Sequence, residues 1–240
     1  MKAALVASGF RRCHLSQVSP RSLSRFWRGG IFVALTAALA GCSTKPVPVV
    51  SVEPQTRGDM WKGLANDEDR SRLGRLGLAW TSALEDARAR HGAAVAAEGP
   101  LLEPRSALPR PGPTPGSYYC RLVRLGRTTT KVPAFEKFKP FYCYVQDEGE
   151  WLSLTKQTGS ERPVGRLWDD DLTDRMIFLG TVARANEAEP PAYGEDPKRN
   201  VAGVFERIAP FRWRLVIPWP QGTSKLDVYE LTPVADQPKG

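Results

Sequence analysis

The chain has 240 residues, with 34 Lys and Arg against 26 Asp and Glu, two His and four Cys, and its formal net charge is +8. Six of the cations lie in the first 30 residues, which contain no acidic residue; removing them leaves 28 cations against 26 acidic groups, so nucleic acid is not expected as a partner. Beyond residue 41 there is one histidine, His91, and no CxxC motif, which disfavours zinc sites and histidine-based triads, and we expect no metal and no cofactor.

Residues 1–41 have the parts of a bacterial signal peptide. A basic region precedes an apolar run at residues 31–40, and a small residue follows before Cys42. The run is far shorter than the roughly 20 residues that a membrane-spanning helix needs. The segment Leu39-Ala40-Gly41-Cys42 resembles a lipobox, in which the cysteine is acylated and becomes the new N-terminus. We therefore predict lipidation at Cys42; the alternative is a chance cysteine after an ordinary signal peptide.

Residues 42–60 are predicted to form an extended tether between the lipid and the folded part. They contain Pro46, Pro48 and Pro54 and show no helical period, and a polyproline-like chain of this length spans roughly 50 Å. Anchoring by more than one acyl chain is stable. Because Ser43 rather than Asp follows Cys42, we expect an outer-membrane lipoprotein that faces the periplasm, with the inner membrane or the cell surface as alternatives.

Residues 61–116 are predicted to form a helical segment followed by a proline-rich loop. Asn66 precedes three acidic residues, as an N-cap does at the start of a helix. Gly92 is the expected C-terminal stop. Apolar residues recur between them at three- and four-residue spacing, which indicates one helix face packed on the rest of the domain: Leu73, Leu76, Trp80, Leu84 and Ala87.

From residue 117 to residue 235 the apolar pattern has period two, which is typical of strands. In residues 211–217, Phe211, Trp213, Leu215 and Ile217 share one face, while Arg212 and Arg214 lie on the other. Eight short strands with brief connections predict a mainly β fold, an eight-stranded antiparallel barrel (lipocalin-like) or a sandwich, packed with residues 61–116 as one domain. The expected strands are 118–125, 141–145, 151–155, 164–168, 176–183, 201–208, 211–217 and 226–231.

Cys120 and Cys143 are the two cysteines that remain for the folded part. In an oxidising compartment they are expected to form a disulfide, since each lies on the apolar face of its strand and antiparallel pairing can bring them together. Closing a loop of this size contributes about 3 kcal/mol by restricting the unfolded chain. A catalytic or metal-binding thiol pair is the less favoured alternative, because the usual histidine partners are missing from the sequence.

Three groups of residues are candidates for chemistry. The acidic turn at residues 169–174 offers carboxylates for calcium, but hairpin tips are commonly acidic for solubility, and we expect no metal there. Serine and threonine hydroxyls flank Lys156, but Thr155 and Lys156 are adjacent in a strand and point to opposite faces, so we expect no catalytic residue. The third group is a candidate anion-binding set at a barrel mouth. The alternative is that these arginines solvate the sheet surface and pair with nearby acidic residues. The members of the set are Lys156, Arg162, Arg166, Trp168, Arg207, Arg212, Trp213 and Arg214.

Several short motifs resemble a family of bacterial lipoproteins known as domain of unknown function 4893. The likeness covers residues 65–234 and implies an envelope location and a fold, without an activity. A more distant, purely architectural similarity links the predicted barrel to small metalloprotease inhibitors of the Inh type. The motifs that carry the family resemblance are YCR (119–121), FYC (141–143), TGSERPVGRL (158–167), FLG (178–180), RIAPFRWRL (207–215) and KLDV (225–228).

These features predict a non-enzymatic binding module. Its expected partners are the membrane, through the N-terminal lipid, and an anionic envelope ligand or a periplasmic protein. One alternative is a protease inhibitor in which residues 43–60 occupy a protease active site. The other is an envelope enzyme, which would need a carboxylate of strongly perturbed pKa in a pocket, and no such residue stands out in the sequence.

Overall fold

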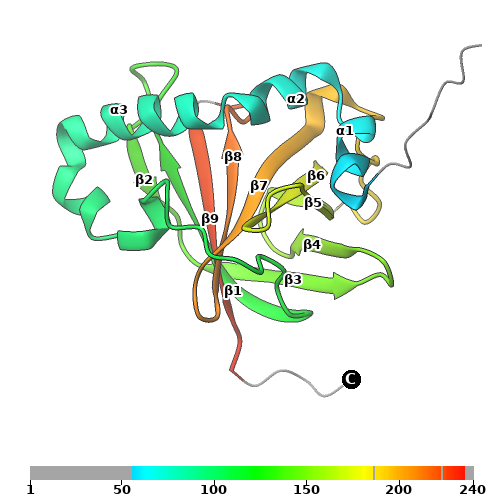
Figure 1. The fold of residues 1–240 in the computed structure, drawn as a ribbon. Coiled ribbons are helices and arrows are strands. Elements are labelled where there is room, and N and C mark those ends of the chain that lie inside the picture. Colours follow the sequence, from blue (N-terminus) through cyan, green and yellow to red (C-terminus); the bar gives the residue numbers. More distant parts are fainter. Residues whose placement is uncertain (1–55, 186, 223, 236–240) are drawn as a thin grey trace, which may run out of the picture. The chain divides into compact units, whose positions relative to one another are not determined.

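Nine strands form one antiparallel sheet that closes into an eight-stranded barrel with one extra strand (Figure 1). The computed structural model describes residues 56–185, 187–222 and 224–235; the predicted signal peptide, the lipidation site and most of the tether lie outside these residues. The sheet order is β2-β1-β3-β4-β5-β6-β7-β8-β9, and β1 also pairs with β9, which closes the barrel. The strands are β1 Gly116–Leu125, β2 Phe135–Lys137, β3 Phe141–Asp147, β4 Leu152–Lys156, β5 Glu161–Asp169, β6 Arg175–Arg184, β7 Asn200–Ala209, β8 Arg212–Pro218 and β9 Leu226–Pro233.

All eight predicted strands are present, and β2 is the one that the sequence pattern does not reveal. Its three residues pair with the second half of β1, while β3 pairs with the first half. A three-residue strand shows too little alternation to be recognised, and only the neighbouring β1 stabilises it as a strand.

The sequence predicts a single helix in this region. The structure instead has two longer helices, with a short helix before them. The Asn66 side chain caps α2 by accepting a hydrogen bond from the Asp69 backbone at 2.7 Å, as predicted. The chain leaves helical geometry at Arg75 and again at His91, one residue before the predicted stop at Gly92; α3 resumes after this kink and ends at Ala96, with Val95 buried in the cluster that joins α3 to the sheet. The helical elements are η1 Arg57–Asp59, α1 Met60–Leu64, α2 Asp67–Gly74, α3 Leu76–Ala96, η2 Gly99–Leu102 and η3 Pro197–Arg199.

The expected tether ends earlier than residue 60, since η1 and α1 begin at Arg57 and Met60. Trp61 of α1 is buried against β5 and β6, which ties this short helix to the barrel. Over the described residues, no helix is long and apolar enough to cross a membrane.

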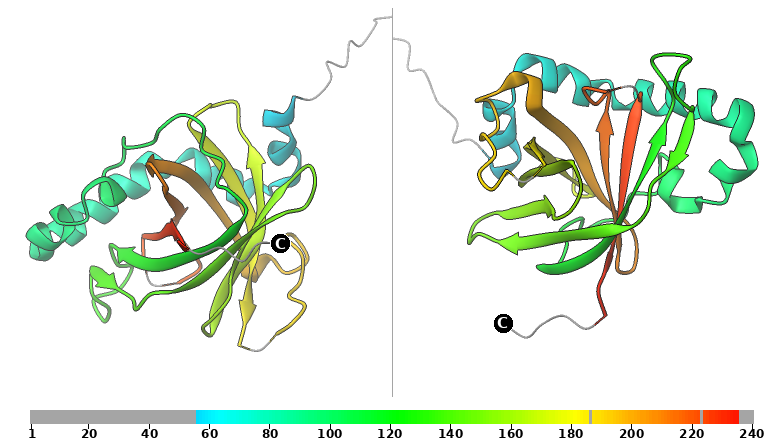
Figure 2. Two further views of the ribbon diagram at one scale, coloured as in Figure 1. Left: turned by 90° about the horizontal axis from the view of Figure 1, so that it is seen from below. Right: turned by 180° about the vertical axis from the view of Figure 1, so that it is seen from behind.

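Three apolar clusters hold the fold together. One fills the barrel and includes Phe178, Phe205 and Leu215. The second joins α3 and η2 to the outer faces of β1, β8 and β9, and the third joins α1 and α2 to β5, β6 and β7. The helices therefore cover one part of the outer surface, and β3 and β4 have no helical layer over them in the described chain (Figure 2).

The predicted disulfide between Cys120 and Cys143 is present inside the barrel. Cys120 lies opposite Phe141 in the register and Cys143 lies opposite Tyr118, so the cysteines are diagonal neighbours on the inward face with Cα atoms 5.9 Å apart. Both are buried. The bridge therefore links β1 to β3 from within the core.

Phe211 differs from its expected place on the inward face of β8. It lies in the tight connection between β7 and β8 with a φ of +54°, and 75% of its surface is exposed. Pro210 occupies the first position of this two-residue connection with its φ held at about −65°, and a type II turn then requires a positive φ at the second position. The turn geometry therefore removes Phe211 from the alternating pattern, which begins at Trp213.

Gly165 and Gly180 face each other across β5 and β6 where the barrel wall is tightest. A Cβ at Gly165 would lie 2.4 Å from the Leu179 carbonyl oxygen, and one at Gly180 would lie 2.2 Å from that of Val164. These contacts are far below van der Waals distance. The two strands can approach this closely only because neither residue has a side chain.

Candidate functional site

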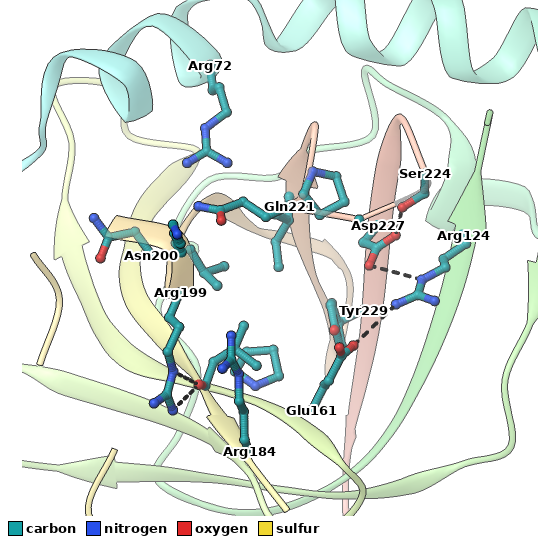
Figure 3. A pocket seen from close by; sticks show the side chains of 17 residues that line it. Arg72, Arg124, Glu161, Arg184, Arg199, Asn200, Gln221, Ser224, Asp227 and Tyr229 are labelled. Carbon is teal, nitrogen blue, oxygen red and sulfur yellow. Dashed lines mark hydrogen bonds and ion pairs between the residues drawn. The ribbon is translucent and has the colours of Figure 1, made fainter. Parts of the chain in front are cut away.

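A cavity of about 320 Å³ opens at the end of the barrel where β1, β6 and β8 end and β5, β7 and β9 begin (Figure 3). We call it the mouth cavity. Arg72 of α2 points towards it from the helical layer, while the other side chains come from strand ends and loops (Figure 3). Its lining residues are Arg72, Arg124, Glu161, Pro163, Val182, Arg184, Lys198, Arg199, Asn200, Val201, Ile217, Pro220, Gln221, Gly222, Ser224, Asp227 and Tyr229.

Arg124 and Asp227 form the polar wall of this cavity. They are direct neighbours in the register of β1 and β9, and the Arg124 Nε donates to the Asp227 carboxylate at 3.3 Å. Arg124 also lies 3.9 Å from the Glu161 carboxylate, and the Ser224 hydroxyl donates to Asp227 at 2.6 Å (Figure 3). Burial raises the pKa of Asp227 even though Arg124 and Ser224 stabilise its ionised form.

Tyr229 lies next to this pair, two residues further along β9. Burial and the nearby Asp227 raise the pKa of its phenol, so the hydroxyl stays protonated. Among the described residues, none forms a hydrogen bond with the Tyr229 hydroxyl. A phenol in this state can donate a hydrogen bond to a ligand in the cavity.

On the opposite wall, Arg199 is held by two partners. Its Nε donates to the Val182 carbonyl oxygen at 2.8 Å, and its Nη1 donates to the Glu187 carboxylate at 3.1 Å. The hydrogen bond from Arg199 lowers the pKa of Glu187 to about 2. This pairing fixes the loop that follows β6 against the start of β7 and shapes the rim of the mouth cavity.

The mouth cavity has an excess of positive charge. Five of its lining residues are Lys or Arg and two are acidic, and two of the cations, Arg72 and Arg199, pair with Asp69 and Glu187 just outside the lining. The exposed Arg184 and Lys198 side chains form no ion pair with any described residue. Two buried donors, Arg72 Nε and Asn200 Nδ2, have no hydrogen-bond partner within the described part of the chain. Unpaired cations and donors around one cavity are suited to an anion.

The eight residues proposed from the sequence as an anion-binding set are not brought together. Lys156 faces inward beside the mouth cavity; its ammonium donates to the Glu161 carbonyl oxygen at 2.8 Å and lies 4.5 Å from the centre of the Phe141 ring. Burial lowers the pKa of Lys156. Its neighbour Thr155 lies on the outer face, as the alternation predicted, and does not approach the ammonium.

Four of the arginines in that set have their own partners; Arg162, Arg166 and Arg212 lie on the outer face, while Arg207 lies opposite Trp213 near the end of β7. Arg162 donates to the Glu187 carbonyl oxygen at 2.7 Å, and Arg166 forms an ion pair with Glu148 at 3.2 Å. Arg207 donates to the Pro109 carbonyl oxygen, and Arg212 pairs with Glu230. None of these four arginines lines the mouth cavity.

The other three residues of the set are buried in different cores. Trp213 lies inside the barrel with its ring edge-on to Tyr118, and Trp168 packs outside it beneath α1, 4.6 Å from the Trp151 ring. Arg214 is fully buried under the outer helical layer. Successive residues of a strand point to opposite sides of the barrel wall. Trp213 and Arg214 are neighbours in the sequence and therefore lie on opposite sides of that wall.

The acidic turn between β5 and β6 is used to hold α1. Asp170 accepts a hydrogen bond from the Trp61 indole at 3.0 Å and pairs with Arg175, while Asp171 pairs with Lys62 at 2.6 Å. In the described ranges, no three His, Cys, Asp or Glu side chains are grouped as metal ligands.

The residues of the mouth cavity were not predicted as a site. One usable signal was present: Arg124 shares the inward parity of Cys120 and Leu122, and Asp227 shares that of Tyr229 and Leu231. A charged residue at an inward position near a strand end indicates a polar barrel mouth. Which strand ends surround the mouth depends on how the sheet closes into a barrel, and the sequence pattern does not show this.

The fold and the site define a class: an antiparallel eight-stranded barrel, partly covered by N-terminal helices, with a cation-lined cavity at its mouth. A family model described as "Domain of unknown function (DUF4893)" matches residues 61–231, and the chain belongs to this family. No curated protein and no solved structure matches the sequence or the fold. The architectural similarity to Inh-type inhibitors therefore stays a prediction.

Proposed function

We propose that this protein is a lipid-anchored component of the bacterial envelope that faces the periplasm and binds a small anionic ligand in the mouth cavity without transforming it. The location rests on the signal peptide and the lipobox-like segment before Cys42. The ligand rests on one observation: Arg184 and Lys198, two exposed cations that line the mouth cavity, form no ion pair with any described residue.

The size and shape of the mouth cavity support a small ligand. Its volume of about 320 Å³ is at the lower end of the range for small-molecule sites. Arg184 and Lys198 at the rim can meet an incoming anion, while Tyr229 and Arg124 lie deeper and can orient it. A carboxylate or phosphate group matches the fork of donors that arginine presents.

Binding is tested on the full-length protein extracted from its own membrane. Native mass spectrometry should show a bound small molecule, and titration of ligand-free protein with inorganic phosphate or acetate should give saturable binding. The double variant Arg184→Ala/Lys198→Ala should weaken binding about tenfold, since it removes two charge-assisted contacts. The matched control Arg88→Ala/Arg90→Ala removes two exposed cations of α3 and should bind like the parent. Repeated ligand-free spectra together with no saturable titration would overturn the proposal.

Anchoring is tested separately. Cells labelled with a radioactive or clickable fatty acid should label the parent protein, and Cys42→Ala should abolish the label and release the protein from the membrane fraction. Unlabelled parent protein in the cytosol would contradict the envelope location whatever the mouth cavity binds.

A further inference from the structure

A second groove of about 480 Å³ lies on the outer face of the barrel, over β4, β5 and β6, away from the mouth cavity. We propose that this outer groove, together with the tyrosine row beside it, binds an uncharged saccharide chain. The proposal is independent of the anionic ligand, because it concerns the other side of the barrel wall and a different set of side chains.

Two rows of cross-strand neighbours form the floor of the outer groove. One row runs Thr155, Val164, Thr181 across β4, β5 and β6, because each of these residues lies directly opposite the next in the register, and Tyr144 of β3 lies beside Thr155 at its end. The parallel row runs Gln146, Ser153, Arg166, Leu179. Direct neighbours in an antiparallel sheet share a face, so the floor is a continuous strip about 14 Å wide at the usual strand spacing.

Two walls border this floor and hold their shape without a ligand. Leu64 at the end of α1 forms one, with half of its surface exposed, and residues 190–193 form the other. The Tyr193 hydroxyl donates to Asp69 at 2.6 Å and accepts from the Asn66 backbone at 3.2 Å, which ties the second wall to α2. A groove with fixed walls lowers the ordering cost of binding.

The groove lining is uncharged overall and more apolar than polar, with several hydroxyls set among apolar side chains. Ser153, Thr155 and Thr181 contribute hydroxyls, and the one lining cation, Arg166, is paired with the one lining acid, Glu148. The Thr181 hydroxyl and the Trp168 indole N–H are buried at this surface without a hydrogen-bond partner among the described residues. A neutral ligand with many hydroxyls can pair with the half-buried Ser153 and Thr155 hydroxyls, whereas an anion has no free cation here to meet it.

Exposed tyrosines extend the groove along the same outer face. Tyr144 borders Thr155 of the floor, and Tyr142 lies beside it on β3 with 46% of its surface exposed. The Tyr142 ring is 5.2 Å from that of Tyr119 on β1. Sugar rings present an apolar C–H face that stacks on aromatic rings and a rim of hydroxyls, and aromatic residues with a polar tip suit such half-wet surfaces.

A peptide fits this surface less well than a saccharide. An extended peptide usually binds by adding a strand to a free sheet edge. Here β3, β4, β5 and β6 are each paired on both sides, so the backbone groups of the floor are already used. Recognition must come from side chains, and those available are hydroxyls, one amide, tyrosines, apolar side chains such as Leu64 and Leu179, and the paired Arg166 and Glu148.

The test uses the full-length protein in a detergent without a sugar headgroup, such as a dimethylamine oxide. It is titrated with the tetrasaccharide of N-acetylglucosamine and with cellotetraose, by calorimetry and by saturation-transfer NMR. At least one should bind saturably. Tyr144→Ala should weaken the binding of that tetrasaccharide about tenfold through loss of stacking. Thr155→Val, which keeps the side-chain shape but removes the hydroxyl, should weaken its binding about fivefold.

The control is Phe211→Ala, which removes a more exposed aromatic ring from the β7–β8 turn and should leave saccharide affinity unchanged. Arg184→Ala/Lys198→Ala should also bind the saccharide normally, which separates the two sites. The proposal is overturned if neither tetrasaccharide binds at millimolar concentration, or if Tyr144→Ala and Thr155→Val, with parental thermal unfolding, bind as tightly as the parent.

Discussion

Arg214 of β8 donates from its Nε to the carboxylate of Glu206 on β7 at 2.6 Å, and both side chains are buried. The two residues are direct neighbours in the register. The remaining guanidinium nitrogens donate to backbone carbonyl oxygens of residues 100–104, including those of Leu101 at 3.0 Å and Glu103 at 2.8 Å. The Trp80 ring of α3 lies 4.9 Å from the guanidinium carbon. One arginine thus fastens the helical layer and the loop after it to the barrel.

Replacing this arginine should be strongly destabilising. Arg214→Met leaves Glu206 buried and unpaired and frees several carbonyl oxygens, so we expect a loss of about 3–5 kcal/mol in the free energy of unfolding. Burial already raises the pKa of Glu206 with Arg214 present. Urea denaturation measures the loss. Adding Glu206→Gln to Arg214→Met should recover part of it, and a double variant no more stable than the single one would contradict this account.

The disulfide should stabilise the barrel and resist reduction in the native state. Cys120 and Cys143 are 2% and 3% exposed, so a reductant reaches them only when β1 and β3 separate. We expect Cys120→Ala/Cys143→Ala to lose about 3 kcal/mol of stability. Alkylation after treatment with dithiothreitol, followed by mass spectrometry, should label neither cysteine in buffer and both in denaturant. Labelling at equal rates in the two conditions would refute the buried bridge.

The rim pair of Glu187 and Arg199 should make stability depend on acid pH. Because the folded pKa of Glu187 is lowered from 4.5 to about 2, its contribution is complete above about pH 4.5 and disappears as the pH falls towards 2. Glu187→Gln should therefore lower the urea midpoint at pH 6 and have little effect near pH 2. Glu189→Gln, an exposed residue of the same loop, is the control. A Glu187→Gln effect that is the same at both pH values would exclude the ion pair as its cause.

Glycine-to-alanine substitutions should act in opposite directions at two places. Gly180→Ala should destabilise the protein by several kcal/mol or prevent barrel closure, because its Cβ would lie 2.8 Å from Gly165 Cα and 2.2 Å from a carbonyl oxygen. Gly77→Ala in α3 has no atom within 4 Å of the new Cβ and should stabilise the helix by about 1 kcal/mol. Thermal unfolding compares the two. Equal and small effects would show that β5 and β6 can separate at this point.

Most of the local structure could be predicted because its causes are local. Alternation along a strand and the side-chain cap at Asn66 depend on neighbours a few residues away, and both are found where the sequence placed them. The failures have local causes as well: Phe211 lies in a turn that needs a positive φ, and the three residues of β2 are too few to show a period.

The candidate sites could be predicted much less well. The set that includes Arg162, Trp213 and Arg214 gathered residues by charge and nearness in sequence, and the barrel wall separates them. The mouth cavity instead joins Arg72 to Tyr229, which lie at opposite ends of the folded part of the sequence.

By itself, the sequence determined the approximate positions of eight of the nine strands, the face on which most of their residues lie and the cysteine pair, because period-two alternation records which side of a sheet is apolar. Only the tertiary structure decided which strand ends meet at one mouth and which outer faces the helices leave bare. Those relationships depend on the pairing of β1 with β9 and on the packing of the helices α1, α2 and α3 against the barrel. These long-range contacts leave no periodic signal in the sequence.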